Sequence, residues 1–288
     1  MNGAMQDNAP AVAARKGAGI TQGWLLLGVG LPMLALMLVL TIFAPLVAPY
    51  DPSATSPDSL APASAAHWLG TDSIGRDVLS RLIVGGRTTL LITVSAVLIA
   101  LAAGLILGLA AGYLGGRTDE IIMRLLDVVF AFPVLLLAIA VVAALGPTVP
   151  NLILTIAIVY TPAMARVVRA PVLSVKQWDH VEAARSVGMS EMRLVLRHIL
   201  PIVVSPILVA TSLTLSQTIF TVTALSFLGL GPPPPDPNWG GMLSEARQFM
   251  ELAPLTVVGP ALAIVFATLT FIIIANGLRE VLDVGSVR

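Results

Sequence analysis

The 288-residue sequence contains no cysteine, only 11% charged residues and only 5% aromatic residues. The absence of cysteine excludes disulfides and thiolate metal or redox centres. The charged fraction is less than half of the roughly 25% found in soluble domains. Hydrophobic residues make up 57% of the chain, and the zero net charge gives no sign of a nucleic-acid partner. This composition is that of a membrane protein.

Residues that could carry out chemistry are equally scarce. The sequence has no nucleophile with a positioned base, no paired carboxylates and no metal-ligand spacing, so it predicts neither a catalytic nor a metal site. The three histidines, His67, His180 and His198, are scattered. Only two lysines occur, and no glycine-rich phosphate loop precedes either of them. We therefore expect no enzyme activity, no cofactor and no ATP site in this chain.

Long stretches without charge alternate with short polar segments. The charge-free stretches cover residues 17–50, 88–116, 128–165 and 252–278, and a further apolar run follows Pro201. One membrane crossing needs about 20 apolar residues. The stretch 128–165 is therefore long enough for two helices, divided at Gly146, Pro147 and Pro150. The sequence predicts an all-α membrane protein with six transmembrane helices.

The distribution of arginine and lysine predicts the orientation. With both termini in the cytoplasm, the inner segments carry twelve of these residues and the outer segments four, as the positive-inside rule requires. The predicted parts are a disordered cytoplasmic tail (1–22), a transmembrane domain (23–288), external segments (51–87 and 229–252) and a cytoplasmic loop (170–200).

The second half of the first external segment predicts a short amphipathic helix. Asp72 or Ser73 could cap it, and Gly85 with Gly86 would end it before the second span. Its apolar residues recur at helical spacing: Ile74, Val78 and Leu82.

Glycine recurs every four residues in the second span. This spacing places the glycines on one face, where another helix can approach closely. The residues are Gly104, Gly108, Gly112 and Gly116.

No ionisable residue lies in the middle of any predicted span. Gln217 and Asn276 are the notable polar side chains there. Ion-coupled secondary transporters usually need a buried charge, which disfavours that class of protein. If the protein moves a solute uphill, the energy must come from outside the chain.

A polar and basic island at residues 179–201 separates two apolar runs. It predicts two short helices, the first capped by Asp179 with Glu182 reaching back in a capping box. Gly188 would end this helix in a left-handed conformation, and Ser190 would start the second. A simple linker between spans is the alternative interpretation.

The island resembles a loop found in inner-membrane permease subunits of bacterial ABC importers. Glu182, Ala183 and Ala184, with Gly188 four residues later, match the E-A-A-x-x-x-G pattern of that loop. His198 stands where the usual pattern has isoleucine, and the ending Arg197-His198-Ile199-Leu200-Pro201 is similar to the dipeptide, oligopeptide and nickel branch. Further matching stretches are Leu69–Asp77 with Ser80 and Arg81, Ala131–Pro133, Phe227–Gly231 and Trp239–Gly240. The resemblance points to the second, C-type permease of the pair.

This resemblance implies a type I permease fold and a set of partners. These would be a homologous second permease, two cytoplasmic ATPases that bind ATP and Mg, an external solute-binding protein and the lipid bilayer, with no nucleic acid. The ATPase-coupling loop would comprise Glu182, Ala183, Ala184, Gly188, Leu200 and Pro201, the alanines allowing close approach. Glu182 would either cap its own helix or pair with a cation on the ATPase.

The resemblance leaves other assignments open. Asp72, Arg76 and Asp77 would contact an external partner, either the second permease or the solute-binding protein, or they would belong to a solvated amphipathic helix. The segment 227–239 would cap the translocation path. Di- or oligopeptides are the expected substrates, and nickel chelates or glutathione are the alternatives. No substrate-binding residue is predicted, and a membrane scaffold without transport activity is a further class.

Overall fold

The computed structural model describes residues 9–283, and the regular elements in this range are helical. The long helices are α1 (Ala9–Ile42), α3 (Val78–Leu114), α6 (Val149–Val175), α9 (Leu200–Leu225) and α11 (Leu255–Asp283). The shorter helices are α2 (Ala44–Val47), α4 (Gly116–Phe130), α5 (Val134–Leu145), α7 (Asp179–Ser186), α8 (Glu191–Leu194) and α10 (Trp239–Ala246). Single turns of π-helix, η1 (Val195–Ile199) and η2 (Ser226–Leu230), flank α9, and a 3-10 turn, η3 (Arg247–Phe249), follows α10.

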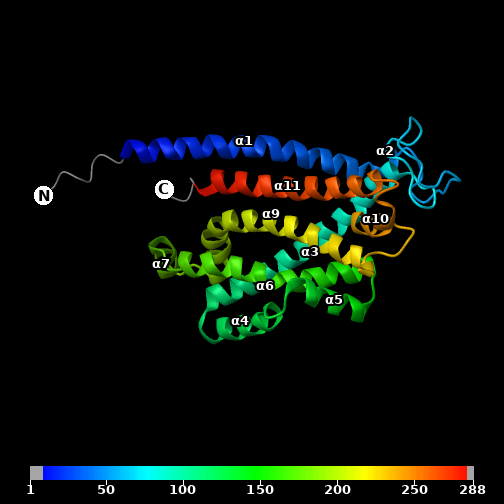
Figure 1. The fold of residues 1–288 in the computed structure, drawn as a ribbon. Helices are drawn as coiled ribbons and strands as arrows, with labels where there is room; N and C mark the ends of the chain where they lie inside the picture. The colour runs from blue at the N-terminus through cyan, green and yellow to red at the C-terminus, as the bar shows by residue number, and fades with distance from the viewer. Residues whose placement is uncertain (1–8, 284–288) are drawn as a thin grey trace.

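The long helices form an elongated bundle. Helices α1 and α11 lie side by side along one side, α9, α3 and α6 fill the middle, and α4 and α5 lie on the opposite side (Figure 1). The N-terminal end of α1 and the C-terminal end of α11 lie at the same end of the bundle as α7, whereas α2 and α10 lie at the other end (Figure 1). We call these the α7 end and the α10 end.

Among the described residues, five helical stretches are long and apolar enough to cross a membrane, and a sixth crossing requires α4 and α5 together. These two helices are bent by 84° relative to each other. The expected six spans are therefore present if the bent pair is one span, but the third is not the straight helix expected from residue 128. Pro133 disfavours helical backbone at Phe132 and so breaks the helix. Alone, the 12 residues of α5 span about 18 Å, less than the bilayer core of about 30 Å.

The start of α1 differs from the expected boundary. Residues 9–22, expected to be a disordered tail, belong to this helix. Alanine is frequent in residues 9–18 and is the strongest helix former. A helix already formed in the span extends into such a sequence at little cost. Residues 1–8 of the expected tail lie outside the described residues.

The second span also starts differently from the prediction. Helix α3 begins at Val78, with Asp77 as its N-cap, and it continues through Gly85 and Gly86. Neither Asp72 nor Ser73 caps a separate helix. A Cβ on Gly86 would lie 2.9 Å from the Trp239 ring, so these glycines allow α10 to approach rather than ending a helix.

The glycine face of α3 packs against α6 as expected. A Cβ added to Gly104 would lie 2.5 Å from the Met164 Cβ, and one on Gly108 would lie 2.5 Å from the Ala165 carbonyl oxygen. Gly112 faces Val172 in the same way, whereas Gly116 lies beyond the end of α3 with nothing near it. Close packing of α3 on α6 therefore depends on the first three glycines.

Replacing Gly108 by leucine is expected to destabilise the protein by about 1–3 kcal/mol, because the added side chain overpacks the α3–α6 contact. Thermal unfolding of the purified protein in detergent measures the effect. Gly28→Leu is the matched control, since nothing lies within 4 Å of a Cβ at Gly28. Equal melting temperatures for the two variants would contradict the proposed packing.

Candidate functional site

The segment between α6 and α9 projects from the α7 end of the bundle (Figure 1). We call residues 176–199 the α7–α8 loop. Helix α7 ends in a left-handed turn at Gly188, where φ is +82°. The Gly188 N–H donates to the Arg185 carbonyl at 3.0 Å, and the Met189 N–H donates to the Ala184 carbonyl at 3.3 Å. This pair of bonds is a Schellman motif, and it confirms that Gly188 ends the first helix.

Apolar side chains anchor the α7–α8 loop to the spans. Val181, Leu194 and Ile199 are fully buried, and Ala184 is 9% exposed. They form one cluster with valines of α6 and α9 that include Val168, Val172 and Val203. The two short helices are therefore fixed to the bundle rather than joined to it by a mobile linker.

The outer face of the loop mixes apolar and charged residues. Val187 is 82% exposed and Met192 is 70% exposed, and Glu182, Ala183 and Gly188 are exposed beside them. Apolar side chains exposed among polar ones mark surfaces that bind other proteins.

Several expected details of the island are wrong. The N-cap of α7 is Trp178 rather than Asp179, and no side chain caps this helix. Glu182 then lies one position beyond the place that a capping box requires, so its side chain faces outward. Ala184 packs inward, where its small size serves the contact within the chain. Ser190 is the N-cap of α8, as predicted.

Leu200 and Pro201 do not start a separate helix. Helix α8, η1 and α9 form one continuous stretch from Glu191 to η2. Pro201 has no N–H, and in a regular α-helix its ring would clash with the carbonyl of Arg197, four residues before it. The π-helical turn η1 lies at Arg197, where the backbone departs from regular α-helix. His198 lies in η1, with its ring 6.3 Å from that of His180.

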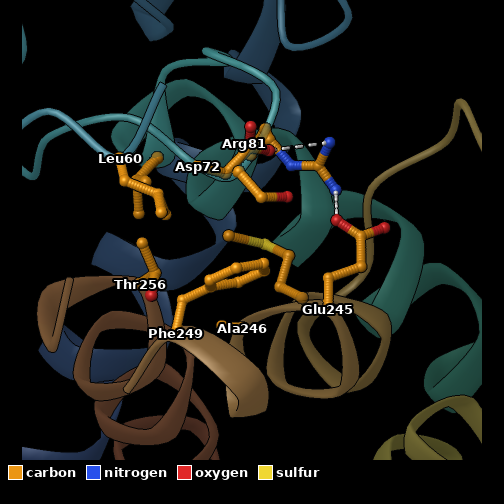
Figure 2. A pocket seen from close by; sticks show the side chains of 10 residues that line it. Leu60, Asp72, Arg81, Glu245, Ala246, Phe249 and Thr256 are labelled. Carbon is orange, nitrogen blue, oxygen red and sulfur yellow. Dashed lines mark hydrogen bonds and ion pairs between the residues drawn. The ribbon is translucent and has the colours of Figure 1, made fainter. Parts of the chain in front are cut away.

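A buried ionic network lies at the α10 end. Arg76 donates to Asp72 and to Glu245, at 2.6 Å in each case, and Arg81 donates to Glu245 at 2.8 Å. Arg81, 3% exposed, also lies 3.5 Å from Asp72 (Figure 2). Figure 2 shows the carboxylate of Glu245, from α10, pointing toward the guanidinium of Arg81, from α3. The network joins the two segments expected to be external.

This network corrects the expectation for Arg76 and Asp77, and it pairs the partly buried Asp72 with Arg76 inside the chain. Arg76 and Asp77 are buried, so neither forms part of a solvated amphipathic helix or of an exposed partner surface. Asp77 accepts hydrogen bonds from the Ser80 N–H at 2.8 Å and from His67 at 2.9 Å. Arg81 and Glu245 were not predicted as members of this network. The sequence does contain a signal for it, because each of the two external segments carries acidic and basic residues at the edge of an apolar region.

The segment 227–239 folds back over the end of α9. Asn238 caps α10 by accepting from the Gly241 N–H at 2.7 Å, and the indole N–H of Trp239 donates to the Leu82 carbonyl at 2.9 Å. The prolines of this segment line a cavity of about 250 Å³ together with Arg81 and Ser226.

Comparison with known proteins gives consistent matches. The model of the family "Binding-protein-dependent transport system inner membrane component" matches residues 104–285, and that of the N-terminal TM domain of oligopeptide transport permease C matches residues 28–62. The glutathione transport system permease protein GsiD of Escherichia coli is 49% identical over 250 residues, which cover 86% of this chain and 82% of that protein. The dipeptide transport system permease protein DppC of Alkalihalophilus pseudofirmus is 43% identical over 256 residues, which cover 88% and 84%.

The inward-facing structure of the MetNI methionine ABC transporter shares the fold. Its TM-score is 0.57 at 19% identity, and the alignment covers 71% of this chain and 96% of that chain. The helical bundle with five or six spans thus has the fold of that transporter chain.

The chain belongs to the family of binding-protein-dependent transport system inner membrane components. Within that family it is a C-type permease subunit of an ABC importer, in the dipeptide and oligopeptide branch. It is a multi-pass protein of the bacterial inner membrane.

Proposed function

We propose that this permease forms half of a path for short peptides, glutathione among them, across the inner membrane. The observation that carries the proposal is the 49% identity to a permease named for glutathione and the 43% identity to one named for dipeptides. Glutathione is itself a tripeptide, so both names describe one class of substrate. The path would be completed by a homologous second permease, and an external binding protein would deliver the substrate.

We place the α7 end in the cytoplasm and the α10 end outside. The arginines and lysines support this orientation, because the α7–α8 loop, α4 and the neighbouring end of α6 carry eight of the sixteen, whereas the segments at the α10 end carry four.

Two cytoplasmic ATPase subunits, which bind ATP and Mg, would supply the energy, since the permease has no phosphate loop of its own. The α7–α8 loop is the proposed coupling element. Val187 and Met192 give it an apolar docking surface, and the buried anchors Val181, Leu194 and Ile199 carry a displacement of that surface into α6 and α9. Ala183 allows close approach, and Glu182, which caps nothing, is free to pair with a cation of the ATPase.

Uptake by the reconstituted complex tests the substrate. The two permeases, the ATPases and the cognate binding protein would be placed in proteoliposomes and supplied with glutathione, dipeptides, longer peptides or a nickel chelate. We expect ATP-dependent uptake of peptides or glutathione and little uptake of the nickel chelate. ATP-dependent nickel uptake without peptide uptake would replace the proposed substrate class.

A further inference from the structure

Helix α9 carries a polar side chain on its outer face, within the membrane. Gln217 is exposed, and within residues 9–283 no hydrogen bond is found for its side-chain amide. It lies 13 residues before the end of η2, about 20 Å along the helix and hence near the middle of the bilayer. Residues 200–230 contain no ionisable side chain.

Four hydroxyl groups of α9 behave differently from the Gln217 amide. Thr211, Ser212, Thr221 and Thr223 donate to carbonyls one turn earlier in α9, at 2.7–3.2 Å. These hydroxyls therefore satisfy themselves within the helix and need no external partner. The amide of Gln217 has no such arrangement, and leaving an amide unpaired in hydrocarbon costs several kcal/mol. Its partner must come from outside the described part of the chain.

A large apolar hollow continues the same face toward the α10 end. Phe220 and Ala224 follow Gln217 at three and seven residues, so the three share one side of α9. Phe220, Ala224 and Phe227 line an open hollow of about 500 Å³, together with Leu135 of α5 and Ile264 of α11. A solute that moves along this face needs an open volume beside the unpaired amide. A helix packed on this face would fill that volume.

We infer that this face of α9 binds the peptide in transit, with Gln217 hydrogen-bonding to a peptide bond of the substrate and the hollow receiving its side chains. A glutamine amide both donates and accepts, as a peptide bond does. It carries no charge, so it discriminates little between peptides of different side-chain charge. This site deepens the proposed function, because it takes the short peptides assigned above.

The absence of cysteine makes the site directly testable. Gln217→Cys and Ala224→Cys would each be the only thiol of this subunit in the reconstituted complex. A water-soluble thiol reagent is expected to label both, and saturating non-thiol dipeptide is expected to abolish labelling of Gln217→Cys. Leu98→Cys, at a position of α3 that is 57% exposed, is the matched control and should stay unlabelled.

Transport kinetics provide the second measurement. Gln217→Leu is expected to raise the KM for dipeptide about twofold to tenfold, the effect of one neutral hydrogen bond, with kcat little changed. Gln217→Asn should recover part of the loss, because it keeps both donor and acceptor.

Three results would overturn the inference: no labelling of Gln217→Cys, labelling that peptide does not reduce, or an unchanged KM in Gln217→Leu. Failure of the proposed function is a different result. In that case the unmodified complex takes up no peptide at all, whereas labelling of Gln217→Cys still reports whether water reaches this face.

Discussion

Gly188→Asp is expected to reduce ATP-driven uptake about 100-fold or more, with the amount of inserted protein unchanged. If the α7–α8 loop docks on an ATPase, residue 188 is enclosed beside Val187 and Met192, both exposed in the free chain. An unpaired charge placed in such an interface costs about 3–5 kcal/mol, which corresponds to a factor of at least 100 in binding. Uptake and substrate-stimulated ATP hydrolysis in proteoliposomes measure the loss.

Gly188→Asn is the matched control for this variant. Asparagine has the shape of aspartate without its charge, and both tolerate a positive φ better than other residues. Nothing lies within 4 Å of a Cβ at this position, so neither substitution clashes inside the chain. We expect Gly188→Asn to keep most of the uptake. Normal uptake and ATPase stimulation in Gly188→Asp would remove the coupling role from the loop.

The second large effect is expected at the ionic network of the α10 end. Glu245→Ala removes the acceptor shared by Arg76 and Arg81 and leaves the buried Arg81 with Asp72 at 3.5 Å. We expect the free energy of unfolding to fall by about 3 kcal/mol. This is the lower end of the range for a broken buried ion pair, because Glu245 is itself 38% exposed. The melting temperature of the purified permease should fall by several degrees.

Two further variants test the cause of that loss. Glu251→Ala, at an exposed acidic residue nearby in sequence, should leave the melting temperature unchanged. The double variant Glu245→Ala/Arg81→Met should recover much of the stability, because an apolar side chain then replaces the unpaired charge. Additive losses in the double variant would mean that Arg81 and Glu245 do not act as a pair.

The periodic and compositional features of the sequence predicted the fold well. Charge-free lengths identified the spans, glycine spacing identified the α3–α6 contact, and Gly188 identified the end of α7. These features depend on local chain geometry, which a sequence records directly. The 84° bend between α4 and α5 was not predicted, because a charge-free length does not report where a helix breaks.

The polar details were predicted less well, and the reason is physical. Arg76 and Arg81 are separated from Glu245 by more than 160 residues, and only the folded chain brings them together. The capping role given to Asp179 failed because one position along a helix decides which residue is the N-cap. Ala184 faces inward for a similar reason, since neighbouring residues of a helix point in different directions.

The π-helical turn before Pro201 has a mechanical consequence. Because η1 joins α8 to α9 without a break, helical backbone runs continuously from Glu191 past Gln217 to the end of α9 at Leu225. One end of this stretch carries the surface proposed to meet the ATPase, and Gln217 lies farther along it. A displacement imposed at the cytoplasmic tip therefore reaches the peptide-facing side chains through the helix itself, and the bends that could absorb it are the π-helical turn η1 and Pro206.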